Sequence, residues 1–104
     1  MISDAVKYEI LAKIKSRTYH DKISGAKLGD SFGLNSVQVR KIINYFRSKE
    51  HLPIASTSKG YWWGTEPWHL DKTDEHLESR IIGIQNARTG IKIAREERVQ
   101  GRFL

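Results

Sequence analysis

The most informative part of the chain is ISGAKLGDSFGLNSVQVRKIINYF, which covers residues 23–46. Its first ten residues predict a short helix, because Ser24 is a favourable N-cap and apolar side chains recur at helical spacing. Gly33 stands where the end of that helix needs a residue that tolerates a positive φ. Asn35 then starts a second helix, in which Gln38 completes a capping pair. The stretch therefore predicts two helices joined by a tight turn.

The second helix is expected to run over residues 35–49 and to be amphipathic. Apolar side chains recur at the spacing of one buried face, and they are Val39, Ile42, Ile43 and Phe46. The other face carries hydrogen-bonding groups and cations, and residues 35–49 hold four cations and no acid. One face is thus predicted to pack on the core, while the other is suited to a negatively charged partner.

Further elements flank this pair of helices. Residues 3–16 predict a preceding helix, with Ser3 as its N-cap. Residues 52–56 and 61–63 predict two short strands, and the turn between them ends in Gly60, which is typical of a β-hairpin. The fold class is therefore predicted as mostly α with a small β-hairpin.

The C-terminal third of the chain predicts a separate helix with an apolar stripe. We expect a first domain over residues 1–64, a connector over 65–70 and a C-terminal helix within 71–104. The stripe consists of Leu77, Ile81, Ile84 and Ile91. This stripe can pack on one of two partners: the first domain of the same chain, or the same helix of a second copy, which would make a homodimer.

The composition limits the classes of function. The chain has 104 residues, a formal net charge of +6 and no cysteine. Its length fits one small domain with an appended helix, and its charge favours a polyanionic partner, most commonly nucleic acid. The lack of cysteine excludes disulfides and cysteine-based zinc sites. No apolar run approaches the roughly 20 residues that span a bilayer, and charges interrupt any N-terminal signal core, so we expect a cytoplasmic protein without a membrane partner.

No catalytic pattern is present in the sequence. The chain has neither a Ser/His/Asp arrangement nor the glycine-rich loop of a nucleotide-binding enzyme. Its four histidines do not fall at the spacing of metal ligands. We therefore predict no enzyme activity, no catalytic residues, no metal and no cofactor.

The predicted elements follow one another in the order that a winged helix-turn-helix requires: helix, short helix, tight turn, helix, hairpin. In that arrangement the outward face of the longer helix enters the major groove of DNA, and the hairpin turn contacts phosphate or the minor groove beside it. The residues predicted to bind DNA are Asn35, Ser36, Val37, Gln38, Arg40, Lys41, Asn44, Arg47, Ser58 and Lys59.

Residues 23–46 resemble the helix-turn-helix core of winged-helix proteins such as the DNA-binding domain of the biotin repressor. LPIASTSKGYWWG, residues 52–64, is similar to the wing of that family. Over residues 5–95 the chain most resembles small winged-helix proteins encoded by Gram-positive bacteriophages, in which an acidic stretch and a long helix follow the wing. Gly29 departs from the family, which usually has alanine at this position, and we expect the glycine to loosen the short helix slightly.

The resemblance implies sequence-specific binding of double-stranded DNA, by a phage transcription regulator or a replication-initiation factor in the cytoplasm of the bacterial host. The alternative is a module that binds proteins in a phage replication or regulatory complex and does not read a DNA sequence. A strong preference for one duplex over random DNA separates these two functions.

Overall fold

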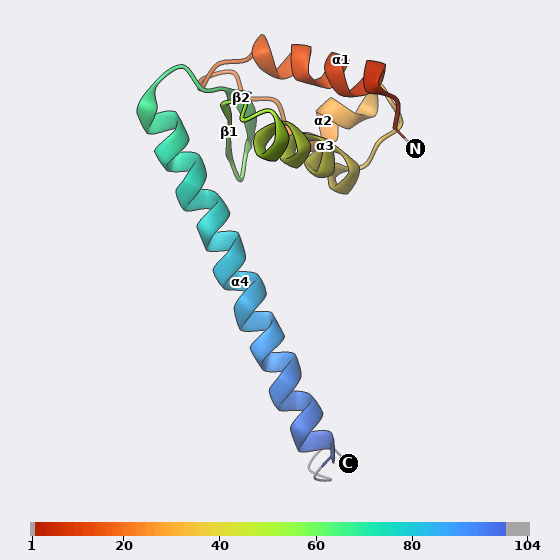
Figure 1. Cartoon of the computed structure of the whole chain (residues 1–104), viewed down its shortest axis with the longest axis vertical. Helices are drawn as coiled ribbons and strands as arrows, with labels where there is room; N and C mark the ends of the chain where they lie inside the picture. Colours follow the sequence, from red (N-terminus) through yellow and green to blue (C-terminus); the bar gives the residue numbers. More distant parts are fainter. Residues whose placement is uncertain (1, 100–104) are drawn as a thin grey trace. The chain divides into compact units, whose positions relative to one another are not determined.

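The computed structural model describes residues 2–99 and has four helices and one hairpin in that range (Figure 1). In chain order the elements are α1 (Asp4–Lys15), α2 (Gly25–Asp30), α3 (Ser36–Lys49), β1 (Ile54–Thr57), β2 (Gly60–Trp63) and α4 (Pro67–Val99). The prediction of a mostly helical fold with a small hairpin and a C-terminal helix is confirmed. Residues 100–104, the end of the predicted C-terminal segment, lie outside the described range. The chain divides into two compact units, residues 1–74 and 75–104.

Each of the first three helices begins at the capping side chain that the sequence predicts. Ser3 Oγ caps α1 and Ser24 Oγ caps α2, each by accepting the backbone N–H three residues further on. At α3, Asn35 Oδ1 accepts the N–H of Gln38 and Gln38 Oε1 accepts the N–H of Asn35, both at 2.9 Å. These bonds satisfy donors that the first turn of a helix leaves unpaired.

The turn between α2 and α3 depends on two glycines. Gly33 has a φ of +66°, so it takes the left-handed conformation that the sequence predicts. The backbone N–H of Leu34 donates to Gly29 O at 3.0 Å, which is the long bond of a Schellman motif. A Cβ on the buried Gly29 would lie only 2.2 Å from Leu34 O. Gly29 therefore lets the chain pass close over α2, a role beyond the slight loosening expected from the sequence.

β1 and β2 form an antiparallel hairpin whose two turn residues are Ser58 and Lys59. The other edge of β2 is bridged to the loop before α2. There the N–H of Tyr61 donates to Ile23 O at 2.8 Å, and the N–H of Ile23 donates to Tyr61 O at 3.0 Å. This bridge was not predicted, because a single paired residue in a loop leaves no periodic pattern in the sequence.

The core of the first unit lies between the three short helices and the hairpin. Its buried apolar side chains are Ile10, Leu11, Ile14, Ile23, Leu28, Val39, Ile42, Ile43, Phe46, Ile54, Ala55 and Trp62. The whole predicted stripe of α3 is among them, so that stripe is confirmed as the inner face of the helix. Trp62 is fully buried and Trp63 only partly, as expected for neighbours on a strand that point to opposite sides.

α4 begins at Pro67, inside the segment 65–70 that was predicted to be a connector. Proline suits the first position of a helix, because it has no N–H to leave unpaired. His69 Nδ1 accepts the N–H groups of Thr65 and Glu66 at 3.2 and 3.3 Å, and so caps the start of the helix. The predicted start near residue 71 is therefore too late, because a histidine is not among the usual capping residues.

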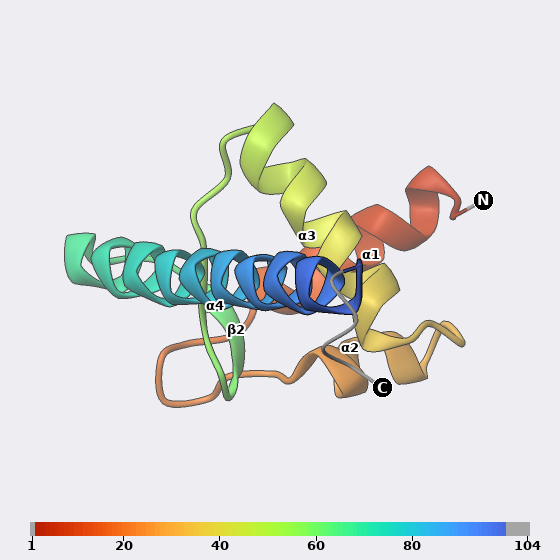
Figure 2. The same cartoon turned by 90° about the horizontal axis from the view of Figure 1, so that it is seen from below.

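The first turns of α4 belong to the unit 1–74. Thr73 Oγ1 accepts the backbone N–H of Ser56 in β1 at 2.9 Å. His69 lies in an aromatic cluster, where its ring centroid is 5.8 Å from that of Tyr19 and 5.5 Å from that of Trp62. The boundary between the units thus falls inside α4, beyond the expected domain end at residue 64. α4 continues past it as a single helix (Figure 1, Figure 2).

Candidate nucleic-acid interface

The exposed face of α3 lies opposite the face that packs on the core. Val37, Lys41 and Asn44 are all exposed, and their spacing of four and three residues places them in one row along the helix. Ser36 is exposed in the first turn, and Arg40 beside the row is partly buried. The row offers an apolar group, a cation and an amide to a ligand that approaches from solvent.

Asn35 and Gln38 are held in place by the cap that they form. Each amide oxygen accepts a backbone N–H of the other residue, so the orientation of both side chains is set within the protein. Their NH₂ groups are the part that can donate to a ligand. The capping pair therefore presents oriented donors at the start of α3, beside Ser36 and Val37.

The side chain of Arg47 is oriented differently from those of the other residues predicted to bind DNA. It is partly buried, and its Nε and Nη2 donate to Ile54 O at 3.0 and 2.8 Å. Nη2 also donates to Ser56 Oγ at 2.9 Å. Because three bonds direct its guanidinium to β1, Arg47 ties the hairpin to α3. We therefore leave it out of the proposed interface.

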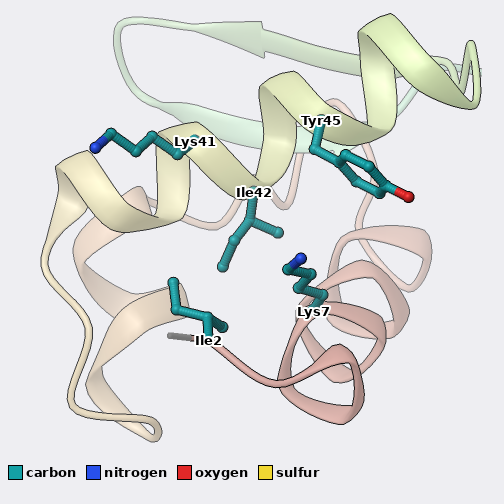
Figure 3. Close-up of a pocket in the computed structure, with 5 residues that line it drawn as sticks. All are labelled: Ile2, Lys7, Lys41, Ile42 and Tyr45. Atoms are coloured by element: carbon teal, nitrogen blue, oxygen red, sulfur yellow. The ribbon is translucent and has the colours of Figure 1, made fainter.

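Lys41 also borders a shallow depression between α3 and the start of α1 (Figure 3). The depression measures about 250 Å³, and its other lining residues are Ile2, Lys7, Ile42 and Tyr45. Lys7 Nζ lies 5.2 Å from the centroid of the Tyr45 ring, within the range of a cation–π contact. Tyr45 is 41% exposed and was missed by the sequence analysis, because an aromatic residue next to an apolar stripe was not counted as surface.

The hairpin turn forms part of a second depression, which is polar. It measures about 340 Å³ and is lined by Tyr19, Lys22, Thr57, Ser58, Lys59 and Lys72. Lys22 Nζ donates to Tyr19 O and lies 3.7 Å from the centroid of the Tyr19 ring. Lys22 and Lys72 were absent from the predicted site, since they come from a loop and from α4. No spacing in the sequence indicates that these segments meet the hairpin turn.

Glu50 directly follows the last residue of α3. Tyr8 Oη donates to Glu50 Oε2 at 3.3 Å, and the carboxylate raises the pKa of Tyr8 above its usual value. Glu50 is at the opposite end of α3 from Ser36 and Val37. The first turns of α3 therefore keep a positive, hydrogen-bonding surface.

Comparison with family models, curated proteins and solved structures gives no match to this chain. The resemblance to winged-helix proteins stays a prediction. What this surface binds is therefore inferred from its own side chains.

Other kinds of site have less support among the described residues. Within residues 2–99, no group of three or more His, Asp or Glu side chains is placed to hold a metal ion. His69 is buried and uses Nδ1 as a hydrogen-bond acceptor at the start of α4. None of the helices within residues 2–99 contains an apolar stretch that could span a bilayer.

Proposed function

We propose that this chain is a winged helix-turn-helix protein that binds double-stranded DNA with α3 in the major groove. The observation that carries the proposal is the row of Val37, Lys41 and Asn44 on a helix without acids whose other face is buried. A helix with its side chains is about 10–12 Å across and the groove is about 12 Å wide, so α3 fits it. The chain's formal net charge of +6 favours the same partner.

Each side chain of the face has a chemistry that suits DNA. Arg40 and Lys41 are cations that can donate hydrogen bonds to the edge of guanine or to phosphate oxygens. The amide of Asn44 matches the donor and acceptor pair of adenine, the NH₂ group of Gln38 can donate to an acceptor on a base, and Ser36 bonds to bases or phosphates. Val37 suits the methyl group of thymine, and Asn35 holds the start of the helix in position.

The hairpin turn supplies the phosphate contacts in this proposal. Ser58 and Lys59 are exposed at its tip. Lys22 and Lys72 line the same depression, so three lysines border one polar site. Such a site suits the DNA backbone, which carries one charge per about 1.7 Å of duplex.

From the resemblance to small phage proteins we propose that this DNA binding serves transcription regulation or replication initiation in the cytoplasm of the bacterial host. One observation favours the alternative of a protein-binding module. Val37 and Tyr45 are 47% and 41% exposed, and apolar groups on a surface helix also suit a protein partner.

Selection of duplexes from a random pool, followed by fluorescence anisotropy at several salt concentrations, tests the proposal. We expect the selected duplex to bind roughly a thousandfold more tightly than random DNA. Lys41→Gln should weaken binding and lower the salt dependence by about one released counterion. Asn44→Ala should relax the preference at one base pair, because it removes a contact to a base edge.

Lys49→Gln is the matched control, since it removes the same charge from the exposed last turn of the same helix. We expect it to leave affinity and salt dependence nearly unchanged. Equal losses in the Lys41 and Lys49 variants would show that only net charge matters. A chain that shows no duplex preference after selection would favour the protein-binding module.

A further inference from the structure

α4 carries an apolar stripe that the DNA-binding proposal does not use. In the unit 75–104, Leu77, Ile81, Ile84 and Ile91 are spaced four, three and seven residues apart, so they lie within about 40° of one line along the helix. Ile81, Ile84 and Ile91 are 55%, 59% and 70% exposed. Several exposed isoleucines in one row along a helix indicate a docking surface, whereas single apolar residues scattered over a surface do not.

The centre of this stripe is a shallow groove on the helix surface. Its lining consists of Ile84, Ala87, Arg88, Ile91 and Lys92, and it measures about 370 Å³. The small side chain of Ala87 leaves room beside the isoleucines. Arg88 lies on the same line as the stripe, and its aliphatic stem extends the apolar surface while its charge reaches water.

The charges along this part of α4 are unevenly distributed. Glu75 and Glu78 stand at its start with Arg80, whereas the segment from Arg88 to Arg95 carries three cations and no acid and is followed by Glu96 and Glu97. A second copy that runs in the opposite direction brings Glu78 of each helix beside Lys92 of the other. Opposite charges in that position favour pairing and fix its direction.

We propose that the stripe of α4 docks on the same stripe of a second copy, in an antiparallel pair. The register that aligns the stripes places Ile81 opposite the partner's Ile91 and Ile84 opposite the stem of the partner's Arg88. Leu77 then packs against the stem of Arg95 in the partner subunit. The same register sets Glu78 next to the partner's Lys92 on the flank of the pair.

A parallel pair is unfavourable for the same residues. In parallel register, Arg88 meets the partner's Arg88 and Arg95 meets the partner's Arg95, so two pairs of like charges lie in the seam. Glu78 and Lys92 are also too far apart along the helix to meet in that arrangement. The charge pattern therefore favours an antiparallel over a parallel second copy on the stripe.

Adjacent isoleucines of α4 provide a matched test of the surface. Ile82 and Ile93 are 49% and 51% exposed, much like Ile81, but they lie about 140–160° from the centre of the stripe. Ile81→Ala/Ile91→Ala and Ile82→Ala/Ile93→Ala remove the same atoms and favour the helix equally. Both variants of the full chain are compared by sedimentation equilibrium without DNA, over a concentration series, with far-UV circular dichroism to check helix content.

We expect the parent to dimerise, the stripe variant to dimerise roughly a hundredfold less tightly, and the off-stripe variant to match the parent. A parent that stays monomeric at every concentration would overturn the proposal, as would equal effects of the two variants. Neither result bears on whether α3 binds DNA, because a monomer can still recognise one half-site.

A charge swap tests the direction of the pair. Glu78→Lys and Lys92→Glu should each weaken dimerisation roughly three- to tenfold, since each places like charges side by side. The double variant restores opposite charges only in the antiparallel register, so it should return to within about threefold of the parent. A double variant that is weaker than both single variants would contradict the antiparallel arrangement.

Discussion

Replacement of Gly29 by alanine is a direct test of the turn between α2 and α3. Helix propensity by itself predicts that alanine stabilises the helix by about 0.5–1 kcal/mol. The structure predicts the opposite sign, because the new Cβ would lie 2.2 Å from Leu34 O and 3.2 Å from Val39 Cγ2. The first of these neighbours is backbone that closes the turn, so it cannot move aside as a flexible side chain would.

The size of the effect follows from these contacts. Relief of the overlap with Leu34 O needs a backbone shift of about 1 Å, because non-bonded heavy atoms rest roughly 3–4 Å apart. Forcing an extra carbon into a well-packed site costs about 1–3 kcal/mol. After the gain in propensity is subtracted, we expect Gly29→Ala to lower the free energy of unfolding by about 1–2 kcal/mol.

Thermal and urea unfolding followed by tryptophan fluorescence measure this change. The three tryptophans of the chain are Trp62, Trp63 and Trp68, all in the unit 1–74, so their emission reports the unit that contains Gly29. For a unit of this size, 1 kcal/mol corresponds to about 4–8 °C in Tm, and we expect Tm to fall by roughly 5–15 °C.

Gly83→Ala is the matched control, because no atom lies within 4 Å of a Cβ added to this glycine of α4. There we expect the ordinary propensity gain of about 1 kcal/mol, seen as higher helix content in far-UV circular dichroism. If Gly29→Ala stabilised the first unit as a helix substitution normally does, the close passage of Leu34 over α2 would be refuted.

Three further substitutions test other contacts of the first unit, each measured by urea unfolding of the full chain. Arg47→Met should lower the free energy of unfolding by about 2–3 kcal/mol, since it leaves the Ile54 carbonyl without its charged donor; no loss would mean that the hairpin is held in another way. Thr73→Val keeps the shape of the side chain but removes the acceptor for the buried N–H of Ser56, and should cost about 1–3 kcal/mol, whereas a neutral result would contradict that hydrogen bond. His51→Gly should stabilise the unit by about 0.5–1 kcal/mol, because His51 has a φ of +54° that glycine adopts without strain; destabilisation would show that the histidine side chain has a role of its own.

The sequence predicted those features that depend on residues within four positions of one another. The cap of Asn35 and Gln38 and the left-handed Gly33 were read from single residues and their spacing. The buried stripe of α3 was predicted in the same way, because a helix brings every third and fourth side chain to one face. Such local interactions form within the element itself, whatever it later packs against.

Contacts between distant segments were decided only by the tertiary structure. Arg47 lies near the exposed face by its spacing, yet packing brings β1 within reach and its donors bond to Ile54. Lys22 and Lys72 meet the hairpin turn although they are 50 residues apart in the chain. Gly29 is a further example. Its helix propensity says nothing of the Leu34 carbonyl, which only the packing of the turn brings close to it. Hydrogen bonds and close approaches between elements depend on how those elements pack, and no short-range pattern of side chains encodes that packing.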